Sequence, residues 1–505
     1  MNLTRRTFLQ TSALGLAATA LSARSWAQVA GANGDIRVAV IGLNGRGKNH
    51  LTSLAKVPGV RVVAICDVDQ LVLDRTAADL AKNGLAPRKF TDLRELLAMD
   101  GLDAVTIATP NHWHSLAGIW AMQAGKDVYV EKPVSHNIWE GRQLVAAAKK
   151  YNRVVQAGTQ IRSGEGLQEA VAWVRAGHLG RITASRGFCY KRRDSIGKTD
   201  GPTPVPPSIN YDLWSGPAPI IPPHRNSKKN GPVHYDWHWI YAYGNGDVGN
   251  QGIHQMDVAR WFLGEPGLPR HSLSVGGRLG YVDDGETPNT QVVIHDYATA
   301  PLIFEVRGLP ARPDGAGSAA TAAMNSAEAA GAAAGTMDKY RGVSIGNVVD
   351  CEGGSIVTNS YFEARALDRD GQLIREFKGA DRHMANFIDV VRSRKTADLY
   401  GPIEEGHVSS ALCHVGNISH QIGRATAPGP LQEAVKGDAP LAEACGRMTE
   451  HLAANGVKLD QTRLTLGQPL AIDAQAERFT GTSAAAANQL LTRNYRAPFA
   501  VPQLA

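Results

Sequence analysis

The stretch Ile36-Arg37-Val38-Ala39-Val40-Ile41-Gly42-Leu43-Asn44-Gly45-Arg46-Gly47 decides the fold of this chain. It opens with a β-branched run that is typical of a buried parallel strand, and it ends in a glycine turn before a helix-compatible segment. A second apolar run, 60–66, ends at Asp67, about twenty residues after the last of these glycines, as dinucleotide-binding units require. Strand, glycine turn, helix, strand and acid together predict such a unit.

The glycine turn also predicts which cofactor binds. It places the N–H groups of a helix N-terminus where a pyrophosphate binds. A carboxylate at the end of the second strand would accept hydrogen bonds from ribose hydroxyls and repel a 2′-phosphate, which favours NAD over NADP. Asn44 stands where the motif has its second glycine; asparagine tolerates left-handed backbone, although its side chain could crowd the phosphates. We therefore predict an NAD site that includes Gly42, Asn44, Gly45, Arg46, Gly47 and Asp67.

Three further strand patterns, 103–109, 127–130 and 154–158, continue this β/α alternation. Polar residues follow each of them. Because the carboxyl ends of parallel strands meet at one edge of an open sheet, ligands bind there. We expect the following residues to complete the cofactor site: Thr109, Pro110, Asn111, His114, Glu131, Lys132 and Gln160.

Composition and charge exclude several other classes of protein. Hydrophobic residues make up 43% of the chain and charged residues 20%, as in a globular protein, and the formal net charge is +6. No dense Lys/Arg stripe or DNA-binding motif is present, so we expect no nucleic-acid partner. Five scattered cysteines form no CxxC pair, which excludes a disulfide scaffold, and no ligand spacing indicates a metal site.

The first residues have the pattern of an export signal. Arg5-Arg6-Thr7-Phe8-Leu9 precedes a short apolar run over 12–23, and Ser25-Trp26-Ala27 has the small-x-small form of a cleavage site. The run is too short to cross about 30 Å of hydrocarbon, and no later segment is long enough. We predict a twin-arginine signal over 1–27, transit through the twin-arginine machinery, and a periplasmic or otherwise exported protein with no membrane span.

Several motifs resemble the Gfo/Idh/MocA family, which is named after glucose–fructose oxidoreductase, inositol dehydrogenase and rhizopine catabolism. The matching segments are 42–47, 109–114, Glu131-Lys132-Pro133, 249–257, 403–407 and, more loosely, 493–499. The resemblance implies an α/β fold with a Rossmann doubly wound parallel sheet and a C-terminal α+β domain with a large open, mostly antiparallel sheet. It also implies a nicotinamide cofactor and a sugar, polyol or related hydroxylated substrate.

The domain organisation follows from these segments. We expect an NAD-binding domain over 35–160, a substrate domain over 161–424 with an Ala/Gly-rich insertion at 315–335, and a C-terminal extension over 425–505 that serves a homo-oligomer interface. Alternating apolar residues predict strands over 272–281, 290–297, 301–307 and 361–367, and helical periodicity marks 382–394 and 404–424.

The candidate catalytic residues are Lys132, His254 and Asn250, of which Asn250 would orient a hydroxyl. The Lys132 ammonium would stabilise an alkoxide, or its neutral amine would act as a base if desolvation lowers its pKa. If 249–264 is one helix, Asn250 and His254 share a face. Many family members carry Asp at the first of these positions, and Asn cannot exchange a proton. Proton transfer would then fall to His254, with Lys132 as electrostatic support; the alternative is that His254 is a core histidine.

An aromatic stretch lies just before this segment. Tyr235, Trp237, Trp239, Tyr241 and Tyr243 occupy alternate positions, so an extended backbone would put them on one face and His238 on the other. They would stack on sugar rings or pack into a core. A proline-rich loop over 201–232 is expected to form a wall of the site. The candidate substrate-binding residues are Arg162, Trp237, His238, Tyr241, Asn250 and Asp257.

Export constrains the reaction, because NAD is not freely available outside the cytoplasm. A tightly retained cofactor must be recycled within each turnover. This predicts hydride transfer at a secondary alcohol of a sugar, polyol or glycoside, with a second substrate restoring the cofactor. The alternatives are an NAD-dependent glycosidase or lyase that works through transient C3 oxidation, and a non-catalytic NAD- or sugar-binding sensor.

Overall fold

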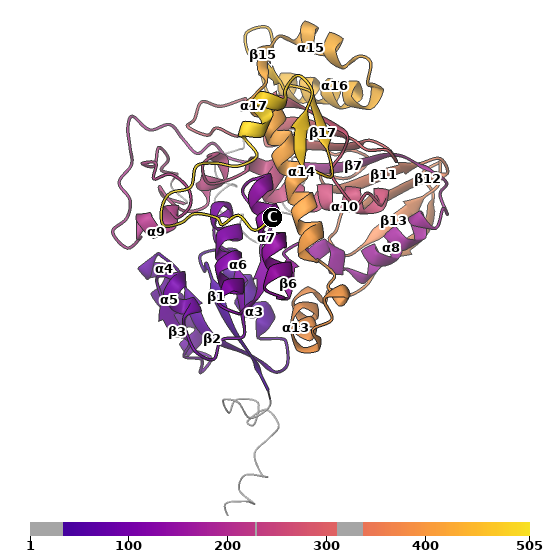
Figure 1. Cartoon of the computed structure of the whole chain (residues 1–505). Helices are drawn as coiled ribbons and strands as arrows, with labels where there is room; N and C mark the ends of the chain where they lie inside the picture. Colours follow the sequence, from indigo (N-terminus) through magenta and orange to yellow (C-terminus); the bar gives the residue numbers. More distant parts are fainter. Residues whose placement is uncertain (1–33, 228–229, 311–336) are drawn as a thin grey trace, which may run out of the picture.

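The computed structural model describes residues 34–227, 230–310 and 337–505. The predicted signal peptide over 1–27 and the predicted insertion at 315–335 lie outside the described residues. Figure 1 shows two sheets, one in each half of the molecule, with helix α14 (Ile403–Gln421) running along the seam between them. No helix of the described part of the chain has the length and apolar character needed to cross a membrane.

The first domain has a six-stranded parallel sheet in the order β3-β2-β1-β4-β5-β6. This is the doubly wound order of a dinucleotide-binding fold, and it confirms the predicted Rossmann sheet. Its elements are β1 (Ile36–Ile41), α3 (Arg46–Leu54), β2 (Val60–Cys66), α4 (Gln70–Ala81), β3 (Arg88–Phe90), α5 (Leu93–Leu97), β4 (Ala104–Ile107), α6 (His114–Gln123), β5 (Asp127–Val130), α7 (Ile138–Lys150) and β6 (Val155–Ala157).

Burial on both faces explains why the central strands are continuously apolar. Val38 and Val40 of β1 pack in a core with Phe387 of α13 (His383–Ser393), while Ala39 and Ile41 pack in a second core with residues of α6. Successive side chains of a strand point to opposite faces, so β1 contributes to both cores. The sheet is therefore held between two helical layers.

The second domain has a large mixed sheet, which confirms the open, mostly antiparallel sheet that the family resemblance implied. In the described residues its order is β14-β13-β12-β11-β7-β10-β9-β8-β16-β15, with β17 and β18 at the β8 side, and the β7–β10 pair is parallel. The strands are β7 (Ile182–Tyr190), β8 (His271–Gly277), β9 (Thr290–Asp296), β10 (Leu302–Arg307), β11 (Ile345–Cys351), β12 (Gly354–Thr358), β13 (Ala364–Leu367), β14 (Leu373–Phe377), β15 (Arg424–Thr426), β16 (Leu464–Leu466), β17 (Leu470–Asp473) and β18 (Arg478–Thr480).

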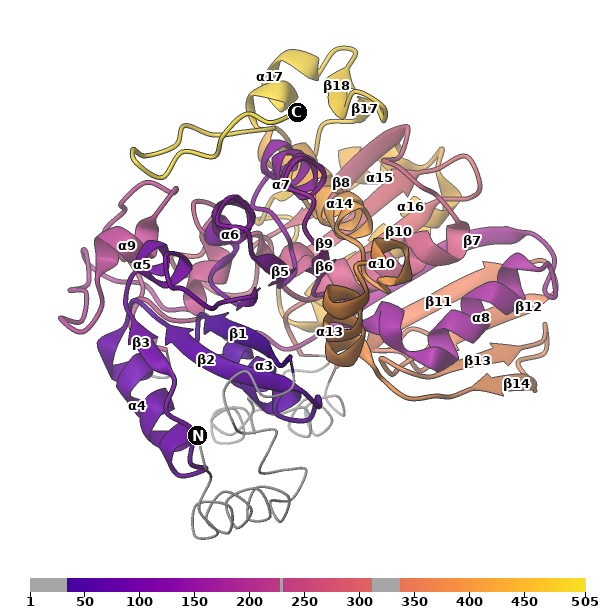
Figure 2. The ribbon, with the colours of Figure 1, turned by 60° about the horizontal axis from the view of Figure 1, so that its bottom comes forward.

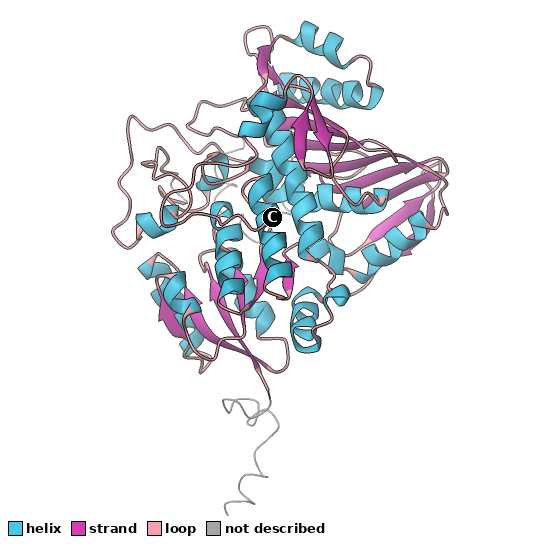
Figure 3. Cartoon of the chain, in the orientation of Figure 1, coloured by secondary structure: helices cyan, strands magenta, loops and turns pink. Residues whose placement is uncertain are grey.

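Helices cover both faces of this sheet. Helices α8 (Glu165–Arg175), α10 (Ile253–Leu263) and α14 lie along one face, as Figure 2 shows. Helices α15 (Pro428–Val435) and α16 (Ala439–Ala454) pack on the other face, against residues such as Val292 and Ile303. Figure 3 shows the same layers by type of secondary structure. The helices on the first face also form the wall toward the Rossmann domain.

The segment 425–505 belongs to both halves of the molecule. Strands β16 to β18 extend the large sheet, and helix α17 (Ala484–Gln489) follows them. The end of the chain then returns to the Rossmann domain, where Phe499 packs edge-on against Trp113 with ring centroids 5.5 Å apart. The tail therefore bridges the two domains.

Most predicted elements of the second domain are confirmed. Strands β8, β9, β10 and β13 and helices α13 and α14 lie where the periodicity placed them. The shared aromatic face over 235–243 depended on an extended backbone, which is not present: residues Asp236–Trp239 form a 3₁₀ helix, and Tyr235 has a φ of +56°. A 3₁₀ turn has three residues per turn, so the five aromatics do not share one face.

Candidate functional site

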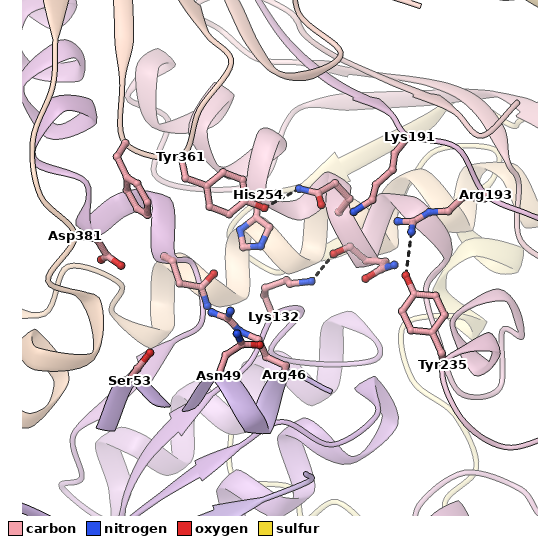
Figure 4. A pocket seen from close by; sticks show the side chains of 14 residues that line it. Arg46, Asn49, Ser53, Lys132, Lys191, Arg193, Tyr235, His254, Tyr361 and Asp381 are labelled. Carbon is pink, nitrogen blue, oxygen red and sulfur yellow. Dashed lines mark hydrogen bonds between the residues drawn. The ribbon is translucent and has the colours of Figure 1, made fainter. Parts of the chain in front are cut away.

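A cavity of about 360 Å³ lies between the two domains, above the carboxyl ends of β1 and β5. Figure 4 shows its lining side chains. Five residues that the sequence singled out meet there, namely Arg46, Lys132, Gln160, Asn250 and His254. Tyr235, one of the alternating aromatics, also lines the cavity. The sequence reasoning selected none of the remaining lining residues as candidates: Asn49, Ser53, Lys191, Arg193, Gln251, Tyr361, Phe362 and Asp381.

The glycine turn is packed too closely for side chains. Gly42 has a φ of +86°, and a Cβ there would lie 2.6 Å from the carbonyl oxygen of Ala108. A Cβ on Gly47 would lie 1.8 Å from the carbonyl oxygen of Gly42. Helix α3 begins at Arg46 with no side-chain cap on its N-terminus. Its first N–H groups therefore suit an anion such as a pyrophosphate.

Two polar side chains complete this end of the Rossmann sheet. The Asp67 carboxylate accepts hydrogen bonds from the backbone N–H of Leu43 at 2.8 Å and of Asp69 at 3.0 Å. The Asn44 amide oxygen accepts from Arg75 at 2.9 Å, which draws this side chain toward helix α4. The acid at the strand end and the uncapped helix fit NAD.

Glu131 is the centre of a buried polar network beside the cavity. Its carboxylate contacts Arg46 Nε at 2.7 Å, His50 Nε2 at 3.1 Å and Gln160 Nε2 at 3.0 Å. Burial alone would raise the pKa of Glu131, but the Arg46 guanidinium and His50 hold it well below its usual value. Glu131 is thus a fixed carboxylate, and it orders the residues between the glycine turn and Lys132.

Lys132 is the ionisable group in the middle of the cavity. Its Nζ donates a hydrogen bond to the main-chain carbonyl of Asn250. Burial lowers the pKa of Lys132 to about 8, with Arg46, Lys191 and Arg193 lowering it further and Glu131 opposing them. Both protonation states of this amine are therefore accessible near neutral pH.

His254 faces Lys132 from the second domain. Burial and the nearby Lys132 charge lower the pKa of His254 well below its usual value, so its imidazole is neutral at pH 7. Its ring lies beside Tyr361, with centroids 5.3 Å apart, and Tyr361 accepts a hydrogen bond from Gln251 at 2.9 Å. Nδ1 of His254 is buried and has no hydrogen-bond partner among the described residues. The imidazole therefore has hydrogen-bonding capacity to spare.

The segment before His254 does not meet the condition that put Asn250 and His254 on one face, because 249–264 is not one regular α-helix. Residues Val248–Gly252 form a π-helical turn, η4, and α10 begins at Ile253. A π turn adds a residue to the helical repeat, so a four-residue spacing no longer defines one face. The cavity still includes Asn250 and His254, but Lys132 meets the Asn250 backbone.

Arg162 and Asp257 pair with each other and do not line the cavity. Arg162 donates to both carboxylate oxygens of Asp257 at 2.8 Å, and Ser409 donates to the same carboxylate at 2.5 Å. Both side chains of the ion pair are at most 6% exposed. Because these bonds occupy the groups, we correct their assignment from substrate ligands to an ion pair that holds α10 near β6.

The other predicted residues lie around the cavity. His114 contacts the carbonyls of Thr109 and Pro133, which ties the Thr109-Pro110-Asn111 turn to the segment bearing Lys132. His238 stacks on Trp237, with centroids 3.7 Å apart, instead of lining the cavity. Tyr241 also lies outside the lining. These side chains were expected at the cavity because an extended strand was assumed.

Comparisons with known proteins agree with this architecture. The model of an oxidoreductase family with an NAD-binding Rossmann fold matches residues 36–159, and the model of that family's C-terminal alpha/beta domain matches residues 170–277. A glycosyl hydrolase family 109 protein from Shewanella sp. (strain W3-18-1) is 34% identical over 152 residues, which are 29% of this chain and 33% of that protein. The chain thus matches about a third of the length of such curated relatives.

Two similar solved structures show the fold. The WlbA dehydrogenase from Bordetella pertussis, in complex with NADH and UDP-GlcNAcA, is 19% identical, with 76% of this chain and 95% of that chain covered and a TM-score of 0.52. An oxidoreductase from Agrobacterium radiobacter, in complex with NAD⁺, L-tartaric acid and magnesium, is 14% identical, with 75% and 94% covered and a TM-score of 0.51. With both domain models matched in sequence and both sheets present, the chain belongs to the Gfo/Idh/MocA oxidoreductase family, whose first domain is an NAD-binding Rossmann fold.

Proposed function

We propose that this protein oxidises a secondary alcohol of a sugar, polyol or glycoside by hydride transfer to NAD. The observation that carries the proposal is the meeting of Lys132 and His254 in one cavity beside the glycine turn. A lysine with a pKa near 8 and a neutral histidine form a set suited to removing a hydroxyl proton. The sugar-nucleotide complex of the WlbA dehydrogenase supports a sugar-related substrate.

The residues that would hold NAD come from the Rossmann domain. The turn over 42–47 and the start of α3 would bind the pyrophosphate, and Asp67 would bind the adenosine ribose. When bound, NAD accepts a hydride from the carbon that bears the hydroxyl. Glu131 and Gln160 keep the polar network between this turn and the cavity in place.

In this proposal Lys132 takes the hydroxyl proton. An effective base has a pKa close to the working pH, which holds for Lys132 at about 8. His254 is a weaker base, because its pKa lies well below its usual value. Its neutral imidazole orients the hydroxyl by a hydrogen bond. From the sequence, the Asn at position 250 assigned proton transfer to His254 and electrostatic support to Lys132. The proposal exchanges these two roles.

We further propose that the protein is exported through the twin-arginine pathway and keeps its NAD between turnovers. A second sugar or polyol would then reverse the reduction. A specific observation favours a second candidate function, an NAD-dependent glycosidase or lyase: the relatives of 34% identity are named glycosyl hydrolase family 109 proteins. In that reaction a transient C3 ketone acidifies the adjacent C2–H, and the C2 proton and the glycosidic group are lost to give a C1–C2 double bond. In the glycosidase, water adds to this double bond before the ketone is reduced again, whereas in the lyase the double bond remains.

Cofactor content and bound-cofactor absorbance test the proposal together. Protein purified without added nucleotide is denatured, and the released nucleotide is identified by mass spectrometry and compared with the protein concentration. We expect near-stoichiometric NAD(H). Sugars, polyols and glycosides are then added to the intact protein while absorbance at about 340 nm is followed.

The outcomes separate the candidates. Reduction of bound NAD by a hydroxylated compound, lost in Lys132→Met, supports the oxidoreductase. Release of an aglycone without net reduction supports the glycosidase or lyase. If the protein binds sugar and this binding is unchanged in Lys132→Met and His254→Ala, the protein is a sensor. A protein that neither contains nor binds NAD contradicts the proposal.

A further inference from the structure

One end of the cavity carries a positive charge that no residue in the described part of the chain neutralises. Lys191 follows strand β7, is half-buried, and has no acidic partner among the described residues. The neighbouring cations are paired: Arg46 with Glu131 at 2.7 Å, and Arg193 with Asp247 at 2.6 Å. A carboxylate on a ligand would supply the counter-ion that the Lys191 ammonium lacks among these residues.

Figure 4 shows how these groups are arranged around Lys132. Lys191, Arg193 and Tyr235 gather on one side of it, and Ser53 and Asp381 lie on the other. The cavity is thus cationic at one end and contains a carboxylate at the other. A substrate that presents a hydroxyl to Lys132 would have its anionic group drawn toward Lys191.

Tyr235 is oriented toward this end by unusual backbone geometry. Its φ is +56° and its ψ is −53°, and the N–H of Asp236 donates to the carbonyl of His234 at 2.6 Å. This is a γ-turn of the positive-φ type, which is rare and strained. Such strain persists where the surroundings enforce it, and it concentrates at functional sites.

The surroundings of the γ-turn hold it from both sides. His234 Nε2 lies 2.9 Å from a carboxylate oxygen of Asp69, and His238 Nδ1 lies 2.5 Å from the carbonyl oxygen of Tyr235. The Tyr235 hydroxyl accepts a hydrogen bond from Arg193 Nη1 at 2.9 Å. Its own proton therefore remains available for a ligand at the cavity mouth.

We propose that Lys191 and Tyr235 form a carboxylate-binding subsite, so that the substrate is a sugar acid such as a uronate or an aldonate. The Lys191 ammonium pairs with the carboxylate, and the Tyr235 hydroxyl donates a hydrogen bond to it. One unneutralised positive charge matches a carboxylate, whereas a phosphate monoester brings about two negative charges. The inference rests on the proposed function, because it assigns the substrate class of the same cavity.

Binding to the purified holoprotein tests the subsite without requiring turnover. Isothermal titration compares a panel of uronates and aldonates, including D-glucuronate, D-galacturonate and D-gluconate, with D-glucose, D-galactose and D-glucose 6-phosphate. We expect at least one acid to bind about tenfold or more tightly than its neutral parent, because a hydrogen bond between an ammonium and a carboxylate is stronger than one between neutral groups. Salt should reduce that ratio.

Three variants assign the effect to the subsite. Lys191→Met should bring the ratio of affinities for acid and neutral parent close to one, Lys191→Arg should restore most of it, and Tyr235→Phe should lower it in part. Lys458→Met removes an exposed charge in the C-terminal segment and is the matched control, so its ratio should equal that of the wild type.

The inference is overturned if no acid on the panel binds more tightly than its neutral parent, if Lys191→Met keeps the wild-type ratio, or if the phosphate ester binds more tightly than every acid. Failure of the proposed function looks different. There, acids bind in a Lys191-dependent way, but no compound on the panel changes the absorbance of the bound cofactor.

Discussion

Lys132 Nζ donates a hydrogen bond to the main-chain carbonyl oxygen of Asn250. The bond joins the carboxyl end of β5 in the Rossmann domain to the π-helical turn η4 of the second domain. It directs the lysine across the domain boundary, toward the cavity that also contains His254. The position of this amine thus depends on both domains, and the first two predictions concern it.

Replacing Lys132 with methionine should remove most of the activity and leave the fold intact. A positioned proton acceptor contributes about 10²–10⁴-fold to a rate, so reduction of bound NAD should slow by that factor. Stopped-flow absorbance on a substrate found by screening measures the rate, and circular dichroism checks the fold. Activity within about threefold of wild type would contradict the role of Lys132.

The pH dependence of alcohol oxidation should follow the neutral amine of Lys132. Burial lowers the pKa of Lys132 from 10.5 to about 8, so the basic form increases as pH rises through 8. Activity should therefore increase about tenfold per pH unit below 8 and level off above it. Asn250→Asp places a negative charge near the ammonium and so raises the pKa of Lys132. The rise of activity should therefore move to higher pH. Activity that instead falls above pH 8 would assign the proton to His254 and electrostatic support to Lys132.

Replacing Arg162 with methionine should destabilise the protein. The substitution leaves the buried Asp257 carboxylate without the bidentate hydrogen bonds from the Arg162 guanidinium. Breaking a buried ion pair costs about 3–5 kcal/mol. The change in the free energy of unfolding is measured with urea. The double variant Arg162→Met, Asp257→Leu removes both charges and should recover part of the loss. Wild-type stability with impaired substrate binding would show that Arg162 is a ligand.

Replacing Gly42 with alanine should disrupt the glycine turn. The new Cβ would lie 2.6 Å from the backbone carbonyl oxygen of Ala108, at a φ of +86°. We expect a loss of about 2 kcal/mol or more in the free energy of unfolding, together with lower NAD content. Gly125→Ala is the matched control, since Gly125 has a φ of +77° but no atom within 4 Å of the added Cβ. Gly125→Ala should lower the free energy of unfolding by about 1 kcal/mol, because alanine is less stable than glycine in left-handed backbone and no steric clash is added.

Local signals explain how much could be predicted from the chain. Three local features predicted the Rossmann sheet: the β-branched run over 36–41, the glycines after it, and Asp67. Each of them reflects the backbone conformation or burial of only a few neighbouring residues. Helices α13 and α14 likewise follow from periodicity. The aromatic alternation over 235–243 did not indicate the true backbone conformation. The γ-turn at Tyr235 depends on contacts between residues distant in the sequence, such as His234 with Asp69.

The sequence by itself determined the order of strands and helices in the first domain, the position of the glycine turn, and the segments that carry Lys132 and His254. Its periodicities encode local backbone conformation and burial. Only the tertiary structure decided that Lys191, Arg193 and Tyr235 meet Lys132 in one cavity, and that Arg162 and Asp257 neutralise each other. The physical reason is that cavities and ion pairs form between side chains far apart in the chain, and the packing of the two sheets sets those distances.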